Sequence, residues 1–199
     1  MARTTEAIVI GGSAGALEAL DGMLPALPSR FSVPVVLVLH ISPAKPSLLA
    51  DVLGRKSALP VKEPNDKEPV ASGAIYVAPP NYHLLFERSR TFSLSVDELV
   101  HFSRPSIDVA FESAADAYGA GLVGVLLSGA NEDGARGLAR VKAVGGRTFV
   151  QAPETASSPE MPEAALRLGA VDRVLSLAEI GPFLASLDDG PSPEGEGVG

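Results

Sequence analysis

The sequence predicts an α/β fold: a doubly wound, mostly parallel sheet flanked by helices, in a Rossmann-like three-layer arrangement with an added β-hairpin. Two observations predict it. Short runs of β-branched apolar residues alternate with segments of helical periodicity, and several runs end in glycine-rich or polar turns. The 199 residues, 46% of them apolar, fit one globular domain. We expect that domain at 1–187 and a disordered tail at 188–199, where almost nothing is apolar.

The first elements follow from apolar runs and their breakers. A buried strand is expected at Ala7 to Ile10, followed by a turn at Gly11 to Gly15. A helix should then run from Ala16 to Leu24, because Pro25 ends its periodic pattern. The β-branched run Val35 to Leu39 predicts the next strand.

The middle of the chain alternates between polar connections and short extended runs. Pro60 to Gly73 is rich in Pro, Lys and acidic residues, which indicates a surface connection. Ala74 to Ala78 is then expected to be a strand. The runs His83 to Glu87 and Thr91 to Val96 are separated by a few polar residues and could pair as a hairpin.

The second half repeats the strand and helix alternation. Ser106 can cap a helix that ends near Gly119, because apolar residues recur between them at helical spacing. A deeply buried strand is expected at Leu122 to Leu127. The remaining expected elements are a helix at Gly134 to Val144, an extended segment at Arg147 to Val150, a helix at Pro162 to Leu168, an extended segment at Val171 to Leu175 and a helix at Leu177 to Leu187.

Composition excludes several functions. The chain has no cysteine, so a disulfide framework, a thiolate metal site and a cysteine nucleophile are impossible. A formal net charge of -8 argues against nucleic acid as a partner, because affinity for phosphates rests on clustered Lys and Arg. The N-terminus lacks a signal-peptide pattern and no apolar run is long enough to span a bilayer, so we expect a cytoplasmic protein without membrane insertion.

The first strand leads into a candidate nucleophile. Gly11 to Gly15 reads G-G-S-A-G, which fits the G-x-S-x-G elbow in its strand-turn-helix context and holds the Ser13 hydroxyl at the turn. The start of the following helix offers backbone N–H groups to an oxyanion. The alternative is an anion-binding or simply connecting turn, since glycine-rich turns are common between strands and helices.

Two further strand ends supply the partners a serine nucleophile needs. His40 follows the second strand, and imidazole can take and return a proton near neutral pH. A carboxylate in the loop Ser128 to Gly134 could orient that ring. The residues alone do not separate Glu132 from Asp133, and either could simply cap the next helix.

The other motifs of common cofactors are missing from the sequence. His83 and His101 are expected to be surface or loop residues. No H-E-x-x-H, EF-hand or Walker pattern occurs, and Ser13 and Ala16 occupy positions where a dinucleotide fingerprint requires glycine. We therefore expect neither a metal nor a cofactor.

Taken together, the motifs resemble the catalytic domain of the chemotaxis protein-glutamate methylesterases, the CheB family. The resemblance covers roughly Ala7 to Leu187 and depends on many motifs in the family's order. These are Ile10 to Gly15, His40, Gly73 to His83, Ser103 to Asp108, Ser128 to Gly134, Gln151 to Pro153, Thr155-Ala156, Met161-Pro162 and Gly169 to Asp172.

The resemblance implies a methylesterase catalytic domain at 1–187 with Ser13 as nucleophile, His40 as general base and acid, and Asp133 rather than Glu132 as the orienting carboxylate. Ala14 and Ala130 stand where family members often carry Thr and Met. Because oxyanion donors there would be backbone N–H groups, these two residues remain candidate oxyanion positions.

The resemblance also implies a substrate and a partner. A methylated chemoreceptor-type protein would lose glutamate γ-methyl groups as methanol, and glutamine deamidation would follow the same acyl chemistry. Arg104 is a candidate substrate contact, although an exposed arginine before a helix is commonly a solvated charge. No receiver domain is expected in cis, because no room exists for one before Ala7, and the site should be open without phosphorylation.

Two other functions remain as alternatives. The chain could be a non-catalytic module that docks onto receptors or a methyltransferase, although a scaffolding role would not require all of Ser13, His40 and Asp133. It could also be a small-molecule serine esterase. The absence of an obvious lid or large apolar insertion in the sequence favours a shallow, protein-accepting site instead.

Overall fold

The computed structural model describes residues 4–40 and 48–188. Its strands are β1 (Ala7–Gly12), β2 (Val35–Leu39), β3 (Val61–Lys62), β4 (Ile75–Val77), β5 (His83–Phe86), β6 (Phe92–Ser95), β7 (Leu122–Leu126), β8 (Arg147–Gln151) and β9 (Arg173–Leu175). Its α-helices are α1 (Ala16–Met23), α2 (Leu49–Gly54), α3 (Ile107–Tyr118), α4 (Ala135–Ala143), α5 (Glu160–Arg167) and α6 (Leu177–Ala185). Short 3-10 turns lie at Leu24–Ala26, Gly119–Gly121 and Pro153–Thr155.

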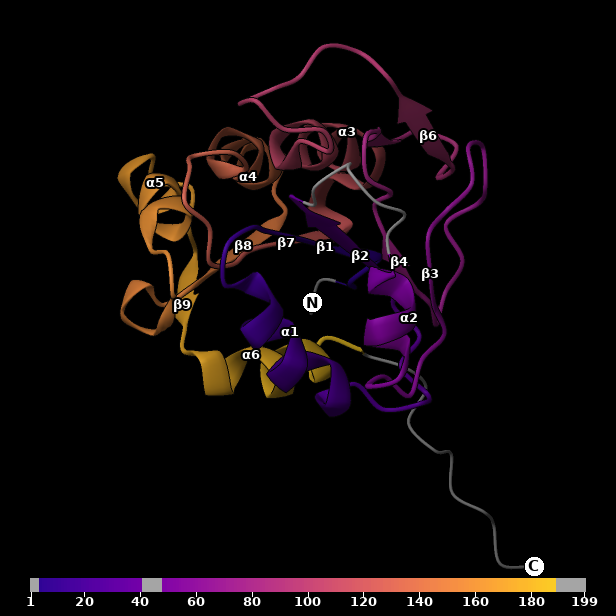
Figure 1. The fold of residues 1–199 in the computed structure, drawn as a ribbon, viewed down its shortest axis with the longest axis horizontal. Coiled ribbons are helices and arrows are strands. Elements are labelled where there is room, and N and C mark those ends of the chain that lie inside the picture. The colour runs from indigo at the N-terminus through magenta and orange to yellow at the C-terminus, as the bar shows by residue number, and fades with distance from the viewer. Residues whose placement is uncertain (1–3, 41–47, 189–199) are drawn as a thin grey trace, which may run out of the picture.

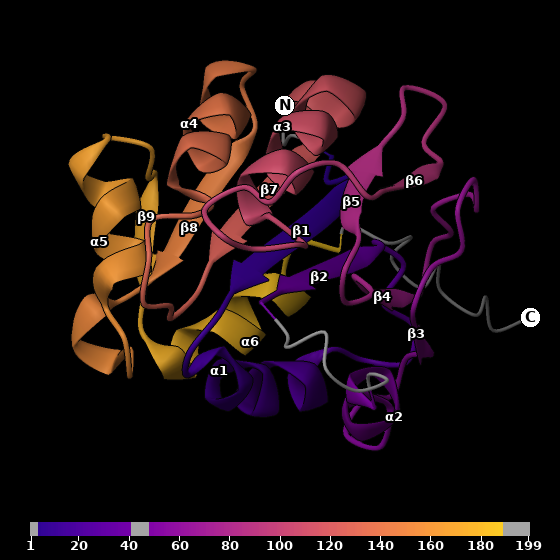
Figure 2. The same ribbon diagram turned by 45° about the horizontal axis from the view of Figure 1, so that its top comes forward.

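The strands of the main sheet are parallel, and helices cover both of its faces. Within the described ranges this sheet has seven strands in the order β3-β4-β2-β1-β7-β8-β9. Figure 1 shows α3, α4 and α5 on one side of it and α1, α2 and α6 on the other. Strands β5 and β6 pair antiparallel as a separate hairpin beside α3 (Figure 2). The predicted doubly wound three-layer fold with a hairpin is confirmed.

Alternation along the central strand divides the core into two halves. Ala7 and Val9 point to the face covered by α3, whereas Ile8 and Ile10 point to the face covered by α1 and α6. All four residues are fully buried. A strand that is apolar on both faces fits the middle of such a sheet, where helices cover both sides, and β1 occupies that position. Its carboxyl end therefore lies between the carboxyl ends of β2 and β7.

The structure corrects two expectations from the sequence and adds one helix. The predicted surface connection at 60–73 contains a strand, because Val61–Lys62 pairs with β4 at the sheet edge. Leu49–Gly54 forms a helix for which we had no sequence prediction. His83, expected at the surface or in a loop, begins β5 and exposes only 2% of its surface, because α3 and the loop before it cover the ring. The two short elements depend on tertiary partners and leave little trace in the sequence, and the burial of His83 depends on contacts with distant segments.

The end of the described chain is attached to the fold. Asp188 accepts hydrogen bonds from the backbone N–H and the hydroxyl of Ser32, at 2.8 and 2.7 Å. The rest of the predicted disordered tail, 189–199, lies outside the described residues. Among the helices of the described residues, none has the length and apolar character needed to cross a membrane.

Candidate active site

Three loops meet at the carboxyl edge of the sheet, where the strand order reverses direction. Ser13 follows β1, His40 follows β2, and the loop 127–134 follows β7, on the other side of β1. Backbone hydrogen bonds join these loops: Ser13 N–H donates to Ser128 O (2.9 Å) and His40 N–H to Gly12 O (3.2 Å). In doubly wound sheets this switch point is where ligands bind, so the topology itself brings the three predicted segments together.

The Ser13 turn needs glycine on both sides of the serine. Gly15 has a left-handed backbone with φ 82°, and a Cβ there would lie 2.7 Å from Ser128 Oγ. A Cβ on Gly12 would lie 2.6 Å from the Cβ of Ala16. The Ser128 hydroxyl donates to Ala14 O at 2.7 Å, which fixes the turn against the β7 loop. Ser13 is therefore held at a defined position between strand and helix, with its side chain partly exposed.

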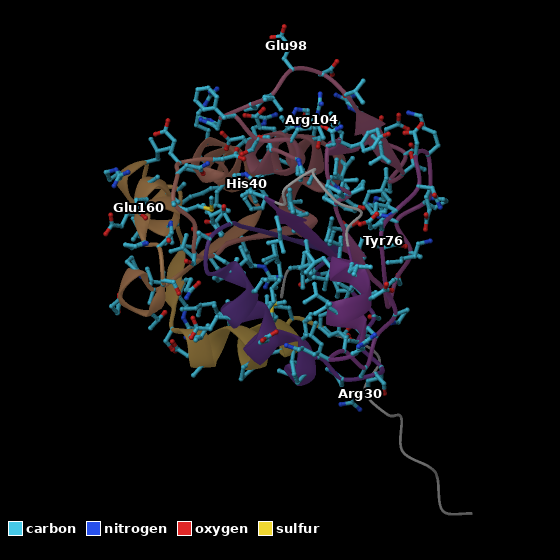
Figure 3. The ribbon with its side chains drawn as sticks, viewed as in Figure 1. Arg30, His40, Tyr76, Glu98, Arg104 and Glu160 are labelled. Atoms are coloured by element: carbon cyan, nitrogen blue, oxygen red, sulfur yellow. The ribbon has the colours of Figure 1, made fainter. Side chains whose placement is uncertain are left out.

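His40 is paired with a buried carboxylate. Its Nε2 lies 2.8 Å from Asp133 Oδ2, and the two side chains expose 12% and 0% of their surface. Ser13, His40 and Ala130 lie together in the wall of a pocket of about 740 Å³. Figure 3 places His40 beside the loops that follow the sheet. Because Nε2 is directed at Asp133, Nδ1 is the ring nitrogen left to exchange a proton with a serine.

The N-terminus of α3 holds the Asp133 carboxylate. The backbone N–H groups of Ile107 and Asp108 donate to it at 2.7 and 2.9 Å, and the Ser106 hydroxyl donates at 2.9 Å. Helix N-termini carry a partial positive charge and unpaired N–H groups, so they favour a carboxylate. The predicted helix cap at Ser106 is confirmed, because its hydroxyl accepts from Val109 N–H at 3.5 Å.

The structure brings Asp133, and not Glu132, to His40. The Glu132 side chain is 72% exposed and lies 4.0 Å from His101. The simple alternative, that one of these acids caps the next helix, fails because the N-cap of α4 is Gly134, and the carboxylate that accepts from the first N–H groups of α4 belongs to Asp108. Asp133 instead binds the N-terminus of the neighbouring helix α3. Its position opposite His40 depends on that long-range contact.

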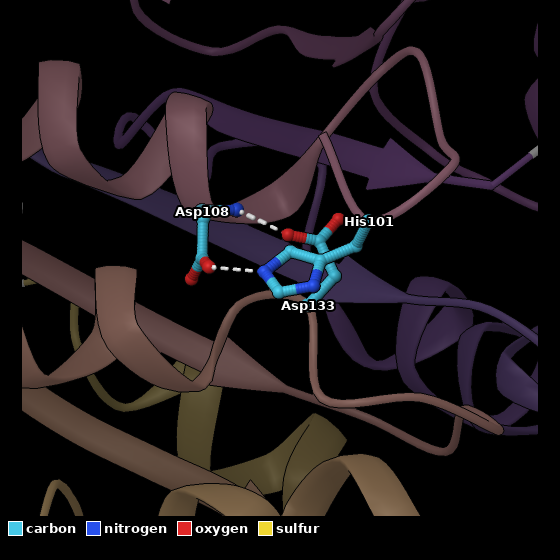
Figure 4. A group of neighbouring side chains, drawn as sticks. All are labelled: His101, Asp108 and Asp133. Carbon is cyan, nitrogen blue, oxygen red and sulfur yellow. Dashed lines mark hydrogen bonds and ion pairs between the residues drawn. The ribbon is translucent and has the colours of Figure 1, made fainter. Parts of the chain in front are cut away.

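A second buried aspartate mirrors this arrangement. Asp108, on α3, accepts from the N–H groups of Gly134 and Gly137 at the start of α4, at 3.0 and 2.7 Å. Its other oxygen lies 3.2 Å from His101 Nε2 (Figure 4). Asp133, which precedes α4, thus binds the N-terminus of α3, and Asp108, which lies on α3, binds the N-terminus of α4. Sequence analysis missed Asp108, because an acid in the first turn of a helix is ordinary.

The two carboxylates have opposite pKa shifts. Burial by itself raises the pKa of Asp133, but hydrogen bonds from His40, from the Asp108 and Ile107 N–H groups and from Ser106 outweigh it and lower that pKa. For Asp108, burial raises the pKa, the Gly137 N–H lowers it, and the nearby Asp133 charge raises it again, leaving it above its usual range. The fold therefore favours the ionised form of Asp133 and disfavours the ionised form of Asp108.

His101, Asp108 and Asp133 lie close enough to be considered as cation ligands, with candidate ligand atoms within 4.8 Å of one another. Their carboxylate oxygens are already used as acceptors. Asp133 accepts from α3 and from His40, and Asp108 accepts from α4 and lies against His101. A carboxylate held in this way has few lone pairs for a cation, so we interpret the group as a hydrogen-bonding network.

The remaining predicted site residues have different positions. Ala130 lies in the pocket wall, whereas Ala14 is exposed in the turn after Ser13. Within the described part of the chain, neither backbone N–H donates to a protein acceptor, as an oxyanion donor requires. Arg104 does not line this pocket: its guanidinium donates to Asn81 Oδ1 at 2.7 Å and to the Val96 and Asp97 carbonyls. Its role as a substrate contact stays a prediction.

A doubly wound α/β sheet with a serine, a histidine and a buried aspartate at its carboxyl edge defines a protein of the serine-hydrolase type. Residues 8–184 match the family described as CheB methylesterase. A crystal structure of the Thermotoga maritima CheB methylesterase catalytic domain superimposes with a TM-score of 0.88 and 33% identity, covering 92% of this chain and 99% of that one. The chain belongs to the CheB methylesterase family.

Curated relatives support the same assignment. A protein-glutamate methylesterase/protein-glutamine glutaminase from Carboxydothermus hydrogenoformans is 40% identical over 184 residues, 90% of this chain and 54% of that relative. A relative from Leptospira interrogans, provisionally named for the same two activities, is 48% identical over 183 residues, which is 92% of this chain and 95% of its own length. The chain thus spans about half of the first relative and nearly all of the second.

Proposed function

We propose that this methylesterase hydrolyses γ-methyl esters of glutamate side chains on a chemoreceptor-type protein and releases methanol, with Ser13, His40 and Asp133 as its catalytic residues. One observation carries the assignment of roles: His40 Nε2 lies 2.8 Å from the fully buried Asp133 carboxylate, in a ring that shares one pocket wall with Ser13. The relatives' names supply the ester and the possible amide substrate.

In the acylation step, Ser13 Oγ attacks the γ-carbonyl carbon of the esterified glutamate while its proton passes to His40 Nδ1. The C–O bond to the methoxy group then breaks, and methanol leaves with the proton from His40. The product is a glutamyl ester of Ser13. Among the described residues the His40 ring is hydrogen bonded to Asp133 and not to Ser13 Oγ, and contacts between a nucleophile and its base often tighten only when substrate binds.

In the deacylation step, water attacks the same carbonyl carbon and gives a proton to His40 Nδ1. The bond to Ser13 Oγ breaks, Oγ regains its proton from His40, and the glutamic acid side chain is released and loses its remaining proton to solvent. A glutamine side chain would follow the same steps with ammonia in place of methanol. The 740 Å³ pocket could admit either side chain.

Asp133 would keep the His40 ring oriented and stabilise its positive charge during both steps. Hydrogen bonds from His40 and from the start of α3 hold the Asp133 pKa below its usual range, which favours the charged form of the carboxylate behind the ring. The N–H groups of Ala14 and Ala130, which are unused within the described chain, would donate hydrogen bonds to the negative charge that develops on the substrate carbonyl oxygen.

The proposal includes the setting of the reaction. We assign catalysis to residues 1–187 and place it in the cytoplasm, on a cytoplasmic segment of a methylated receptor. Arg104 braces a neighbouring loop, and its predicted contact with substrate is not needed for the steps above. A catalytically silent docking module has no need for the buried, ionised carboxylate behind His40, and no observation favours it.

The test is methanol release from a methylated receptor cytoplasmic fragment. Ser13→Ala should lower kcat by roughly 10⁴-fold or more, while a matched variant of a distant serine, Ser186→Ala, should keep wild-type activity. Equal methanol release by wild type and Ser13→Ala would refute Ser13 as nucleophile. Hydrolysis of an aryl ester with no release from any methylated receptor would instead identify a small-molecule esterase.

A further inference from the structure

Phe102 is the most exposed large apolar residue at the candidate active site. It exposes 97% of its surface and lines the same pocket wall as Ser13 and His40. Both His101 and Phe102 have left-handed backbones, with φ 49° and 60°. Non-glycine residues adopt this conformation rarely, and an aromatic ring left in water gains nothing from burial. The fold therefore holds Phe102 outward without any folding advantage from the ring itself.

The loop 96–104 that carries Phe102 is braced at its base. Arg104 Nη1 donates to the carbonyl oxygens of Val96 and Asp97, at 2.7 and 2.9 Å. The buried His83 ring lies 2.9 Å, through Nε2, from Glu98 O. Figure 3 shows Glu98 far out on this loop and Arg104 at its return to the fold. The loop is thus attached to the hairpin and to the residues before α3.

The turn around Phe102 has its own fixed points. Val100 and Ser103 exchange backbone hydrogen bonds across it, at 3.2 and 2.9 Å. His101 is anchored to Asp108 at 3.2 Å (Figure 4). These contacts tie the two left-handed residues to the network that holds Asp133, so the position of the Phe102 ring is set relative to the catalytic residues.

We propose that Phe102 is a specificity-determining residue that packs against an apolar side chain of the substrate protein next to the esterified glutamate. The inference rests on the proposed function and names the partner's chemistry: a segment that presents an apolar residue beside the ester. The pocket of about 740 Å³ is larger than one esterified glutamate side chain needs, which leaves room for a neighbouring residue.

The rest of the pocket wall explains why an apolar contact would matter. Apart from Phe102, eight of its nine lining residues have polar or charged side chains, including His101, Glu132, Glu160 and Arg167. Exposed charges of both signs contribute little net affinity, whereas covering an exposed aromatic ring removes a large apolar surface from water. Phe102 would therefore supply much of the binding energy for a protein substrate and little for a small ester that does not reach it.

The test compares two substrates of the intact protein. For Phe102→Ala, we expect KM for a methylated receptor fragment to rise about 10- to 100-fold, with the loss falling mainly on KM rather than kcat. The ratio of kcat/KM for the receptor to kcat/KM for p-nitrophenyl acetate should fall by a similar factor. Phe102→Tyr should retain most of the wild-type ratio because it keeps the ring.

Val174→Ala is the matched control, because Val174 is an exposed apolar residue on β9 outside the pocket wall. An unchanged receptor KM in Phe102→Ala would overturn the inference alone. So would an equal loss on both substrates, or a wild-type dimer in solution that Phe102→Ala dissociates, since the ring would then serve self-association. Absence of Ser13-dependent methanol release from the wild type would overturn the proposed function and this inference with it.

Discussion

Replacing Asp133 with Asn tests the link between α3 and the candidate active site. The Asp133 carboxylate accepts four hydrogen bonds: Oδ2 takes His40 Nε2 and the Ile107 N–H, and Oδ1 takes the Asp108 N–H and the Ser106 hydroxyl. An asparagine has one acceptor oxygen and one NH₂ group. Whichever way the amide is turned, its NH₂ faces a backbone N–H of α3, and two donors meet.

The size of the effect follows from this count. At least one buried backbone N–H at the start of α3 loses its acceptor, at a cost of about 1–3 kcal/mol in unfolding free energy. If NH₂ replaces Oδ2, it also faces His40 and favours the wrong tautomer of the ring. Loss of the charge behind the imidazole should lower kcat by roughly 10⁴-fold, as for a serine-hydrolase triad carboxylate.

Two assays separate these effects. Urea unfolding should show Asp133→Asn destabilised, whereas Ser13→Ala should be nearly as stable as wild type because Ser13 is partly exposed. Methanol release should be lost in both. Glu132→Gln is the matched control for the neighbouring carboxylate and should keep activity, because its side chain is 72% exposed. An Asp133→Asn protein as stable and as active as Glu132→Gln would refute the reasoning.

Further predictions concern Asp108, Asp133 and the contact between α3 and α4. The raised pKa of Asp108 means that the native state binds its proton more tightly, so this group lowers stability as pH rises from its unfolded pKa through its native pKa. The lowered pKa of Asp133 gives stability above its unfolded pKa that is lost as pH falls through its native pKa. Urea unfolding across the acid range should therefore show Asp108→Asn gaining on wild type as pH rises, and a constant gap would contradict this. Gly137→Ala should lose about 1–3 kcal/mol, because its Cβ would lie 2.7 Å from Phe111 Cβ and 2.9 Å from a backbone oxygen. A Cβ added at Gly22 would meet nothing within 4 Å outside its own helix backbone and chain neighbours, so Gly22→Ala should instead gain up to about 1 kcal/mol in the same denaturant titration. Equal effects of the two changes would contradict the packing argument.

Local sequence patterns were sufficient for the long elements of the fold. Apolar runs identified β1, β2 and β7, and the periodic apolar residues after Ser106 identified α3, because a buried strand or an amphipathic helix must repeat its pattern over several residues. Short elements were missed. Val61–Lys62 is a strand only because it pairs with β4 at the edge of the sheet, and two residues are too few to show a strand pattern.

The sequence by itself determined the fold class and, through its resemblance to a family, the three residues proposed for catalysis. Local reasoning left Glu132 and Asp133 equal, because both precede the same helix. Only the tertiary structure separated them: the start of α3, more than twenty residues earlier in the chain, meets Asp133 with two N–H groups and turns it toward His40. The same holds for Asp108 and Phe102. Their surroundings are built from segments far apart in the sequence. Contacts of this kind produce no local periodicity, so a sequence pattern does not predict them.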